Sequence, residues 1–462
     1  MAVRRRVRDA VASLAALCVF VAPALSHAQS LIRDTEVEET LHQLADPVFE
    51  VAGLDPKEVE IMIIGDKELN AFATSGQRMG LYTGLIIETE TPNQLLGVIA
   101  HETCHIACGH TARSGSMMRA GLRPMLLTMG LGLIAAMAGA PDAAVGLLAS
   151  SSQFSTLAIL TYSRVQEASA DQAAAGYLEK VGRSGRGLAE FFENFRYQEV
   201  FSQARRYAYF RGHPISSERI AALKSRVEKA SNYGRSEDPK EIEAHAVMKA
   251  KLDAFLSPPQ QSFVKYKEKD RSYAARYARA IAYYRASEPD RALKAIDELI
   301  AEQPENPYLW ELKGQVLFEN GRVKEAEAPH RKSVELKPTA PLLRVNLGQT
   351  ILALEEGRRA DEAIAQFHQA LRLENDNTFA WQLLSRAHDR KGQPGLARLA
   401  AAEAHFSLGD ERQARVFGMR AREQLARGTP EWRRATDIVL ASEPSRDELR
   451  TIAREDTRLV AR

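Results

Sequence analysis

The chain has 462 residues, with 62 Lys and Arg against 60 Asp and Glu, and a formal net charge of +2. Its hydrophobic fraction of 45% and charged fraction of 26% are typical of globular proteins, which excludes global disorder and a polytopic membrane protein. The small net charge gives no electrostatic reason to expect a nucleic-acid partner. Three cysteines exclude a disulfide-stapled scaffold. The length predicts two or three domains, each stabilised by a packed core.

The first 28 residues have the pattern of a secretory signal peptide. Four arginines within the first eight residues precede an apolar run over 11–25, which is followed by a small-x-small cleavage sequence ending at Ala28. An uncleaved anchor is the alternative, but the run is shorter than the ~20 residues needed to span a bilayer. We therefore expect an exported, periplasmic protein that is cleaved near Ala28.

The next segment predicts an α+β domain over residues 31–230. Residues 58–64 alternate as a short strand, and a second strand is expected over 79–87, so a small sheet is predicted. From residue 92 to about 229 the apolar spacing becomes helical. The fold class is therefore mainly α, with one small sheet near the start of the mature chain.

Residues 266–440 contain an internal repeat with a period near 34 residues. Three pairs of residues share this offset: Ala280 and Gly314, Ala292 and Ala326, and Pro304 and Pro338. Small residues suit the close approach of two antiparallel helices, and prolines end each second helix. The pattern resembles tetratricopeptide repeats and predicts an α-helical solenoid with a concave face for partner segments. An unrelated helical bundle is the alternative. A linker over 231–265 and a tail over 441–462 are expected to flank the repeats.

The chemistry of the first domain is carried by His101-Glu102-Thr103-Cys104-His105, an H-E-x-x-H motif on a predicted helix. At ~100° per residue His101 and His105 lie one turn apart on the same face, so both imidazoles can bind one ion. Glu102 is displaced around the helix and can reach a metal-bound water without binding the metal. The same motif also occurs on helices that bind nothing, so a further ligand is needed.

Glu167, in the sequence Glu-Ala-Ser-Ala-Asp over 167–171, is the better candidate for the third protein ligand that a zinc peptidase needs. Asp171 lies one turn later and can accept the free N–H of a ligand histidine. His110 would lie about 140° beyond His105 on a continuing helix, away from the metal, so we expect a surface histidine or one that supports a ligand. A solvated acidic pair is the alternative reading of Glu167 and Asp171.

The order of these two motifs resembles the gluzincin family of metallopeptidases that contains HtpX, the CAAX-prenyl endopeptidases and the periplasmic protein BepA. Segments that begin at Asn70, Tyr82, His213 and Glu218 agree with the family pattern. The resemblance covers roughly residues 40–230. The export signal and the repeats indicate the periplasmic branch of the family rather than its membrane-spanning members.

The resemblance implies one Zn²⁺ per chain, held by His101, His105 and Glu167. Glu102 would take a proton from the attacking water and pass it to the leaving amine. His213 would have a catalytic role, in which it stabilises the oxyanion or occupies the open coordination position in a resting state. A helix-start turn is the alternative reading of His213 and its following proline.

Two further roles follow from the same resemblance. Arg219 would assist electrostatically. Tyr82, Thr83 and Gly84 would lie on an edge strand to which substrate adds as a further strand, through main-chain hydrogen bonds that read little sequence.

Cys104 and Cys108 lie one turn apart on the helix that carries the motif. A disulfide between residues i and i+4 of a helix is geometrically poor, so we expect buried free cysteines. Thiol ligation of the metal is the remaining alternative.

An apolar segment from Met125 to Ala140 lies between the second and third ligands and is too short to span a bilayer. A buried helix that covers the active site is favoured. Peripheral membrane contact is the alternative.

Together with the export signal and the repeats, the resemblance implies an exported zinc metalloendopeptidase that cleaves unfolded or misassembled envelope and outer-membrane proteins. It also implies that the repeats recruit partners, including the outer-membrane assembly machinery. The alternative is a chaperone-like assembly factor for outer-membrane proteins whose peptidase site is latent or silent. A plain digestive peptidase would not explain the repeats.

Overall fold

The computed structural model describes residues 30–111, 122, 124–129, 131, 163–201, 213, 216–354 and 358–460. The leader expected over 1–28 and most of the apolar segment over 125–140 lie outside these ranges. The chain forms two compact units. The first comprises Met1–Arg33 and Leu41–Asp238, and the second comprises Asp34–Thr40 and Pro239–Arg462.

The first unit contains a four-stranded sheet in the order β1-β2-β4-β3. Its strands are β1 (Ser30–Ile32), β2 (Glu60–Gly65), β3 (Ala71–Thr74) and β4 (Arg78–Tyr82). β2 and β4 pair in parallel, whereas the outer strands β1 and β3 pair antiparallel with their neighbours. β4 is therefore an interior strand, and β3 is an edge of the sheet.

The second strand expected over 79–87 is wrong in its latter half, because β4 ends at Tyr82 and the helix α3 (Thr83–Glu88) follows at once. The backbone N–H of Gly84 and the hydroxyl of Thr83 both donate to the carbonyl of Asp66, at 2.8 Å. A Cβ at Gly84 would lie 2.2 Å from the carbonyl oxygen of Lys67, so only glycine fits this approach. This tertiary contact overrides the strand-like sequence.

Helix α4 (Pro92–Ala107) runs through the centre of the first unit, and its residues from Gln94 to His105 are buried. It begins with proline in the first turn and with Thr91, whose side chain accepts the N–H of Gln94. It crosses α7 (Arg186–Phe201) closely, since a Cβ at Gly97 would lie 2.7 Å from the Leu188 Cβ. Residues 163–180 form a further helix, and α9 (Ser217–Glu228) completes the packing around the site.

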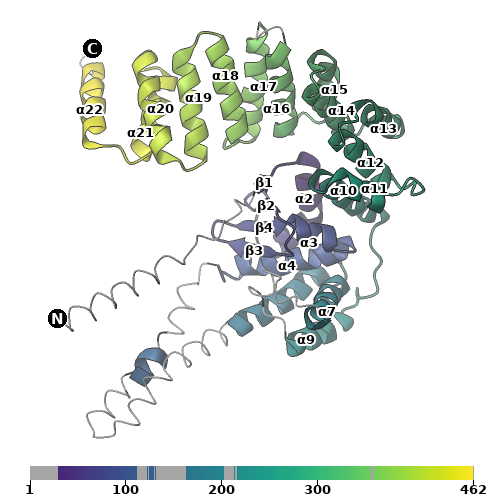
Figure 1. The fold of residues 1–462 in the computed structure, drawn as a ribbon. Helices are drawn as coiled ribbons and strands as arrows, with labels where there is room; N and C mark the ends of the chain where they lie inside the picture. Colours follow the sequence, from purple (N-terminus) through teal and green to yellow (C-terminus); the bar gives the residue numbers. More distant parts are fainter. Residues whose placement is uncertain are drawn as a thin grey trace, which may run out of the picture. The chain divides into compact units, whose positions relative to one another are not determined.

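The second unit consists of helices throughout its described part (Figure 1). Five antiparallel pairs follow one another: α12 (Tyr273–Arg285) with α13 (Pro289–Glu302), α14 (Pro307–Glu319) with α15 (Val323–Leu336), α16 (Pro341–Ala353) with α17 (Ala360–Leu373), α18 (Thr378–Arg390) with α19 (Pro394–Ser407), and α20 (Glu411–Gln424) with α21 (Pro430–Ala441). The solenoid predicted from the 34-residue period is confirmed. Helix α22 (Arg446–Val460) follows and occupies the expected tail.

Most of the segment expected as a linker is helical. α10 (Pro239–Leu256) and α11 (Pro259–Lys265) belong to the second unit, so the stretch without helix or strand is confined to about 229–238. Burial explains the difference, because Lys251 of α10 is buried and pairs with Asp34 at 2.7 Å and with Glu36 at 3.0 Å. These two acids lie at the start of α2 (Thr35–Val51), in the part of the chain that belongs to the second unit.

Among the described residues, no helix has the length and apolar character required to cross a membrane.

Candidate metal centre

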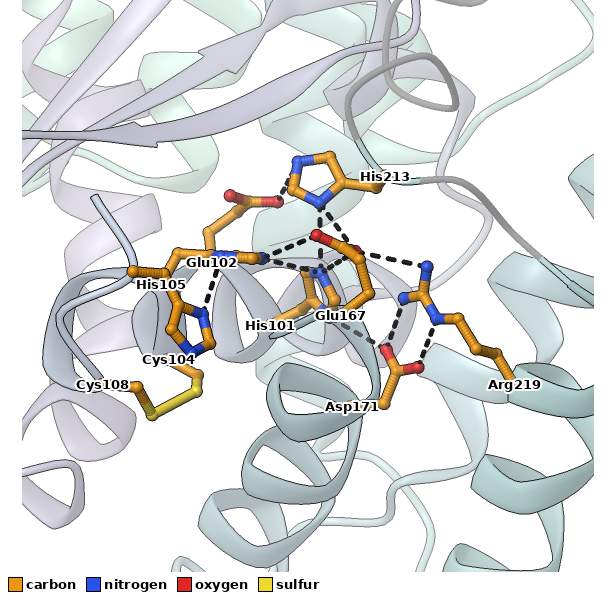
Figure 2. A network of polar contacts seen from close by, with 10 residues as sticks. His101, Glu102, Cys104, His105, Cys108, Glu167, Asp171, His213 and Arg219 are labelled. Carbon is orange, nitrogen blue, oxygen red and sulfur yellow. Dashed lines mark hydrogen bonds and ion pairs between the residues drawn. A yellow bond between two sulfur atoms is a disulfide. The ribbon is translucent and has the colours of Figure 1, made fainter. Parts of the chain in front are cut away.

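Side chains from two helices and one further residue, His213, meet in the first unit (Figure 2). α4 supplies His101, Glu102 and His105, and the helix over 163–180 supplies Glu167. His213 lies ahead of α9 and points into the same cluster (Figure 2). All five side chains are buried, and Glu102 and His101 are fully so.

Four of these side chains direct one ligand atom each toward a common point. The measured separations are 3.2 Å from His101 Nε2 to His105 Nε2, 3.3 Å from His101 Nε2 to His213 Nδ1, 3.3 Å from His101 Nε2 to Glu167 Oε2, 3.1 Å from His213 Nδ1 to Glu167 Oε2, and 3.5 Å from His105 Nε2 to Glu167 Oε1. The two histidines of the motif and Glu167, which we predicted as ligands, therefore lie together, and His213 joins them.

The donor set fits a tetrahedral metal ion. A tetrahedron with metal–ligand bonds of about 2.0–2.1 Å has edges of roughly 3.3 Å, and the five separations scatter around that value. These buried nitrogens and oxygens have too few protons to form a hydrogen bond at every short distance. A bound cation would stabilise the arrangement better than hydrogen bonds alone. Three imidazoles and one carboxylate are ligands that suit Zn²⁺ among the first-row metals.

Asp171 and Arg219 hold the ligands from outside. His101 Nδ1 lies 3.0 Å from Asp171 Oδ1, so the carboxylate can accept its N–H, as the sequence predicts. Arg219 binds Asp171 through Nε at 2.8 Å and Nη2 at 2.9 Å, and its Nη1 lies 3.2 Å from Glu167. Burial opposes ionisation of Asp171, but His101 and Arg219 outweigh it and lower the pKa of that carboxyl.

The electrostatics of the ligands reflect this shared burial. Burial, with the nearby His101 adding to it, lowers the pKa of His105 to about 2, so His105 is neutral and free to bind a metal through a lone pair. Burial would raise the pKa of Glu167, but hydrogen bonds from His101 and His213 lower it below its usual range. Glu167 is thereby kept as a carboxylate.

Glu102 lies beside the cluster rather than in it. Its Oε1 is 3.5 Å from His213 Nε2 (Figure 2). Burial raises the pKa of this carboxyl, while His213, His101 and the backbone N–H of Ala73 in β3 oppose the shift. A buried carboxyl with a raised pKa next to a metal centre has the properties of a general base.

The structure does not support the predicted substrate strand at Tyr82, Thr83 and Gly84. Tyr82 ends the interior strand β4, and the other two residues begin α3 and bond to Asp66. None of the three offers a free strand edge. Among the described strands the outer ones are β1 and β3, and the backbone N–H of Ala73 in β3 faces Glu102. The alternation of apolar and polar residues over 79–87 does not indicate that β3 pairs with β4 and covers its outer side.

The expectation of free cysteines is also wrong. Cys104 and Cys108 form a disulfide, with Cα atoms 5.2 Å apart, within the range that disulfides require. The two cysteines lie in the last turn of the helix. Cys108 is the C-cap of α4, keeps right-handed helical torsions and donates its N–H to the Cys104 carbonyl at 2.7 Å.

Only part of the apolar segment over 125–140 is described. Residues 124–129 are helical, and Leu126 and Leu127 are 63% and 68% exposed. The favoured prediction of a buried helix therefore fails at Leu126, Leu127 and Leu131, whereas Thr128 is buried, and residues 130 and 132–140 lie outside the described ranges.

Fold and site together define a metallopeptidase domain joined to a tetratricopeptide-repeat solenoid. Residues 32–227 match the model of peptidase family M48, and residues 277–341 match a tetratricopeptide repeat model. The first unit is therefore a metallopeptidase domain of family M48, and the family predicted from the motifs is confirmed.

Several curated proteins are similar to this chain. The beta-barrel assembly-enhancing protease of Escherichia coli K12 is 23% identical over 86% of this chain and 81% of its own length. A putative beta-barrel assembly-enhancing protease of Vibrio cholerae is 22% identical over 80% of this chain and 76% of its own length. Metalloprotease LoiP of Escherichia coli K12 is 32% identical over 35% of this chain and 60% of its own length. The first two relatives span both units.

Proposed function

We propose that this protein is an exported, periplasmic zinc metalloendopeptidase that degrades unfolded or misassembled envelope proteins. The observation that carries the proposal is the buried tetrahedral arrangement of His101, His105, Glu167 and His213 with Glu102 beside it. The signal-peptide pattern over 1–28 supports export.

In this mechanism His101, His105 and Glu167 would hold one Zn²⁺. When bound, zinc supplies the Lewis acidity that polarises a peptide carbonyl and activates water. Glu102 accepts the proton of the attacking water and delivers it to the leaving amine nitrogen. Asp171 and Arg219 keep His101 and Glu167 oriented, since both ligands contact one or other of them.

His213 would be the fourth protein ligand of a bound metal in the resting enzyme. Its Nδ1 lies 3.3 Å from His101 Nε2 and 3.1 Å from Glu167 Oε2, and its Nε2 lies 3.5 Å from Glu102 Oε1. Peptide hydrolysis needs one open position for water and substrate. With His213 in that position the site would be latent, and once His213 moved away its imidazole would be placed to stabilise the developing oxyanion.

Substrate adds to the free edge of β3 as an extended strand. Main-chain hydrogen bonds to Ala71–Thr74 would place a scissile bond next to Glu102, because Ala73 faces that carboxylate. This mode reads backbone rather than side chains and suits substrates that have failed to fold.

The repeats recruit partners, and the relatives whose name is beta-barrel assembly-enhancing protease support the outer-membrane assembly machinery as one of them. The exposed Leu126 and Leu127 support peripheral contact of the 125–140 segment with a membrane surface.

Replacing Glu102 by Gln tests the mechanism, because the amide keeps the shape of the side chain but cannot accept the proton. We expect proteolysis of an unfolded outer-membrane protein to fall at least 10²-fold, with one zinc per chain retained by metal analysis. The matched control is Glu193→Gln, an exposed acid on α7 of the same unit. Undiminished cleavage by the Glu102 variant would disprove the assignment.

The second candidate is an assembly factor whose site stays closed, and the position of His213 among the ligands favours it. The same variant separates the two functions. A factor of this kind keeps its cellular role when Glu102 is Gln, and it shows little turnover of unfolded substrate in its native form. A peptidase loses its role with that substitution.

A further inference from the structure

We propose that His110 is a positioning residue for the metal ligand His105, and that the Cys104–Cys108 disulfide holds it in place. The inference rests on the metal site proposed above. It assigns a role to two features that the peptide-hydrolysis mechanism leaves unused.

The end of α4 brings His110 back over His105. Gly109 adopts φ of +70°, its N–H donates to the carbonyl of Ile106 at 3.0 Å, and the N–H of His110 donates to the carbonyl of His105 at 3.0 Å. This is the Schellman arrangement of a helix C-terminus, with glycine at the left-handed position. The prediction that His110 lies far around the helix assumed that the helix continues, whereas the chain reverses at Gly109.

The two rings then meet through one nitrogen each. His105 Nδ1 lies 3.1 Å from His110 Nδ1, and the ring centroids are 5.0 Å apart. His105 Nε2 faces the opposite way, toward His101 and Glu167. If Nε2 binds a metal through its lone pair, the proton of the neutral ring is on Nδ1, and His110 Nδ1 accepts it.

Both histidine ligands of α4 thereby gain a partner for their second nitrogen. His101 Nδ1 lies 3.0 Å from the Asp171 carboxylate, and His105 Nδ1 lies 3.1 Å from His110 Nδ1. Such partners fix the tautomer and the orientation of a ligand ring and strengthen metal binding.

The disulfide closes the same turn. Cys104 precedes His105 and is fully buried, and Cys108 precedes Gly109 and is half-buried. The bridge joins the residues on either side of His105 in this turn (Figure 2). It ends one residue before Gly109, where the chain reverses toward His110. A cross-link across this turn limits the ways in which His110 can move away from its partner.

The test compares zinc affinity, by chelator competition, and the visible spectrum of the Co²⁺-substituted protein in two variants. His110→Ala removes the acceptor, and we expect a loss of zinc affinity of about 10–100-fold and a shifted Co²⁺ spectrum. His110→Asn places an amide oxygen near the position of the imidazole Nδ1, and we expect most of the affinity and the spectrum to return. His42→Ala, at a partly exposed histidine of the same unit, is the control and should change neither.

The double change of Cys104 and Cys108 to Ala tests the role of the disulfide. We expect weaker zinc binding in the wild-type background and little further loss in the His110→Ala background, since both changes act on one contact. Equal losses in His110→Ala and His110→Asn, or wild-type affinity in either His110→Ala or the cysteine variant, would overturn the inference. Wild-type protein that binds no zinc would overturn the proposed function as well.

Discussion

At the scale of single residues, burial decides which charge state each side chain carries. Glu102 and Glu167 are both buried near His101 and His213, yet their pKa values shift in opposite directions. Glu167 receives hydrogen bonds from two imidazoles, whereas burial dominates at Glu102. The first is kept as a ligand anion and the second as a base that can hold a proton.

A buried histidine outside the metal centre should make the free energy of unfolding depend on pH. His330 of α15 is 3% exposed, its Nδ1 lies 2.8 Å from the Thr350 hydroxyl, and burial lowers its pKa to about 4. Between pH 6.5 and pH 4 the unfolded chain binds a proton at this residue that the folded chain does not. Stability is therefore lost as the pH falls through this window, by up to about 3 kcal/mol.

Urea unfolding at pH 7 and pH 5 measures this effect. We expect the wild-type midpoint to fall at pH 5, and His330→Gln to show a smaller difference between the two pH values because glutamine does not titrate. An identical pH difference in both proteins would show that His330 is not responsible.

At the scale of helices, the repeats depend on close contacts at fixed positions. The side chains of Trp310, Arg344 and Trp381 each donate to a backbone carbonyl six residues earlier, at 2.7–2.8 Å. Each bond joins the first helix of a pair to the turn before it. Small residues such as Ala292 and Ala326 are fully buried where the helices meet.

Gly314 is the tightest of the repeat positions that we predicted as small. A Cβ there would lie 2.1 Å from Cδ2 of His330 on the partner helix, so Gly314→Ala forces α14 and α15 apart. We expect this change to lower the free energy of unfolding by about 1–3 kcal/mol, the usual cost of overpacking. Lys294→Ala, at an exposed position of α13, is the control for thermal melting and should have little effect.

At the scale of the whole chain, metal and repeats stabilise different units. All proposed ligands lie in the first unit, and the helix pairs lie in the second. A ligand stabilises only the structure that contains its site.

Removal of the metal with a chelator should therefore lower the midpoint temperature of the first unit's calorimetric transition and leave that of the second unit unchanged. Added zinc should restore the lowered midpoint. Gly314→Ala should have the opposite effect and lower only the midpoint temperature of the second unit, which the chelator does not change. If the chelator lowered both midpoint temperatures equally, the two units would not unfold independently.

The sequence by itself determined the class of enzyme, the repeat architecture and the candidate ligands. His101, His105, Glu167 and Asp171 were predictable because helical spacing places side chains four residues apart on one face. The repeats were predictable because the same close helix contact recurs every 34 residues. These are local or periodic constraints, and a single sequence displays them directly.

Only the tertiary structure decided which contacts form between distant segments. It placed β3 rather than Tyr82–Gly84 at the sheet edge, because strand order depends on pairing across the sheet. It joined Cys104 to Cys108 across the last turn of α4, and it returned His110 to His105 because Gly109 reverses the chain. It made His213 the fourth donor, since a residue 112 positions from His101 can meet it only through the packing of the whole unit.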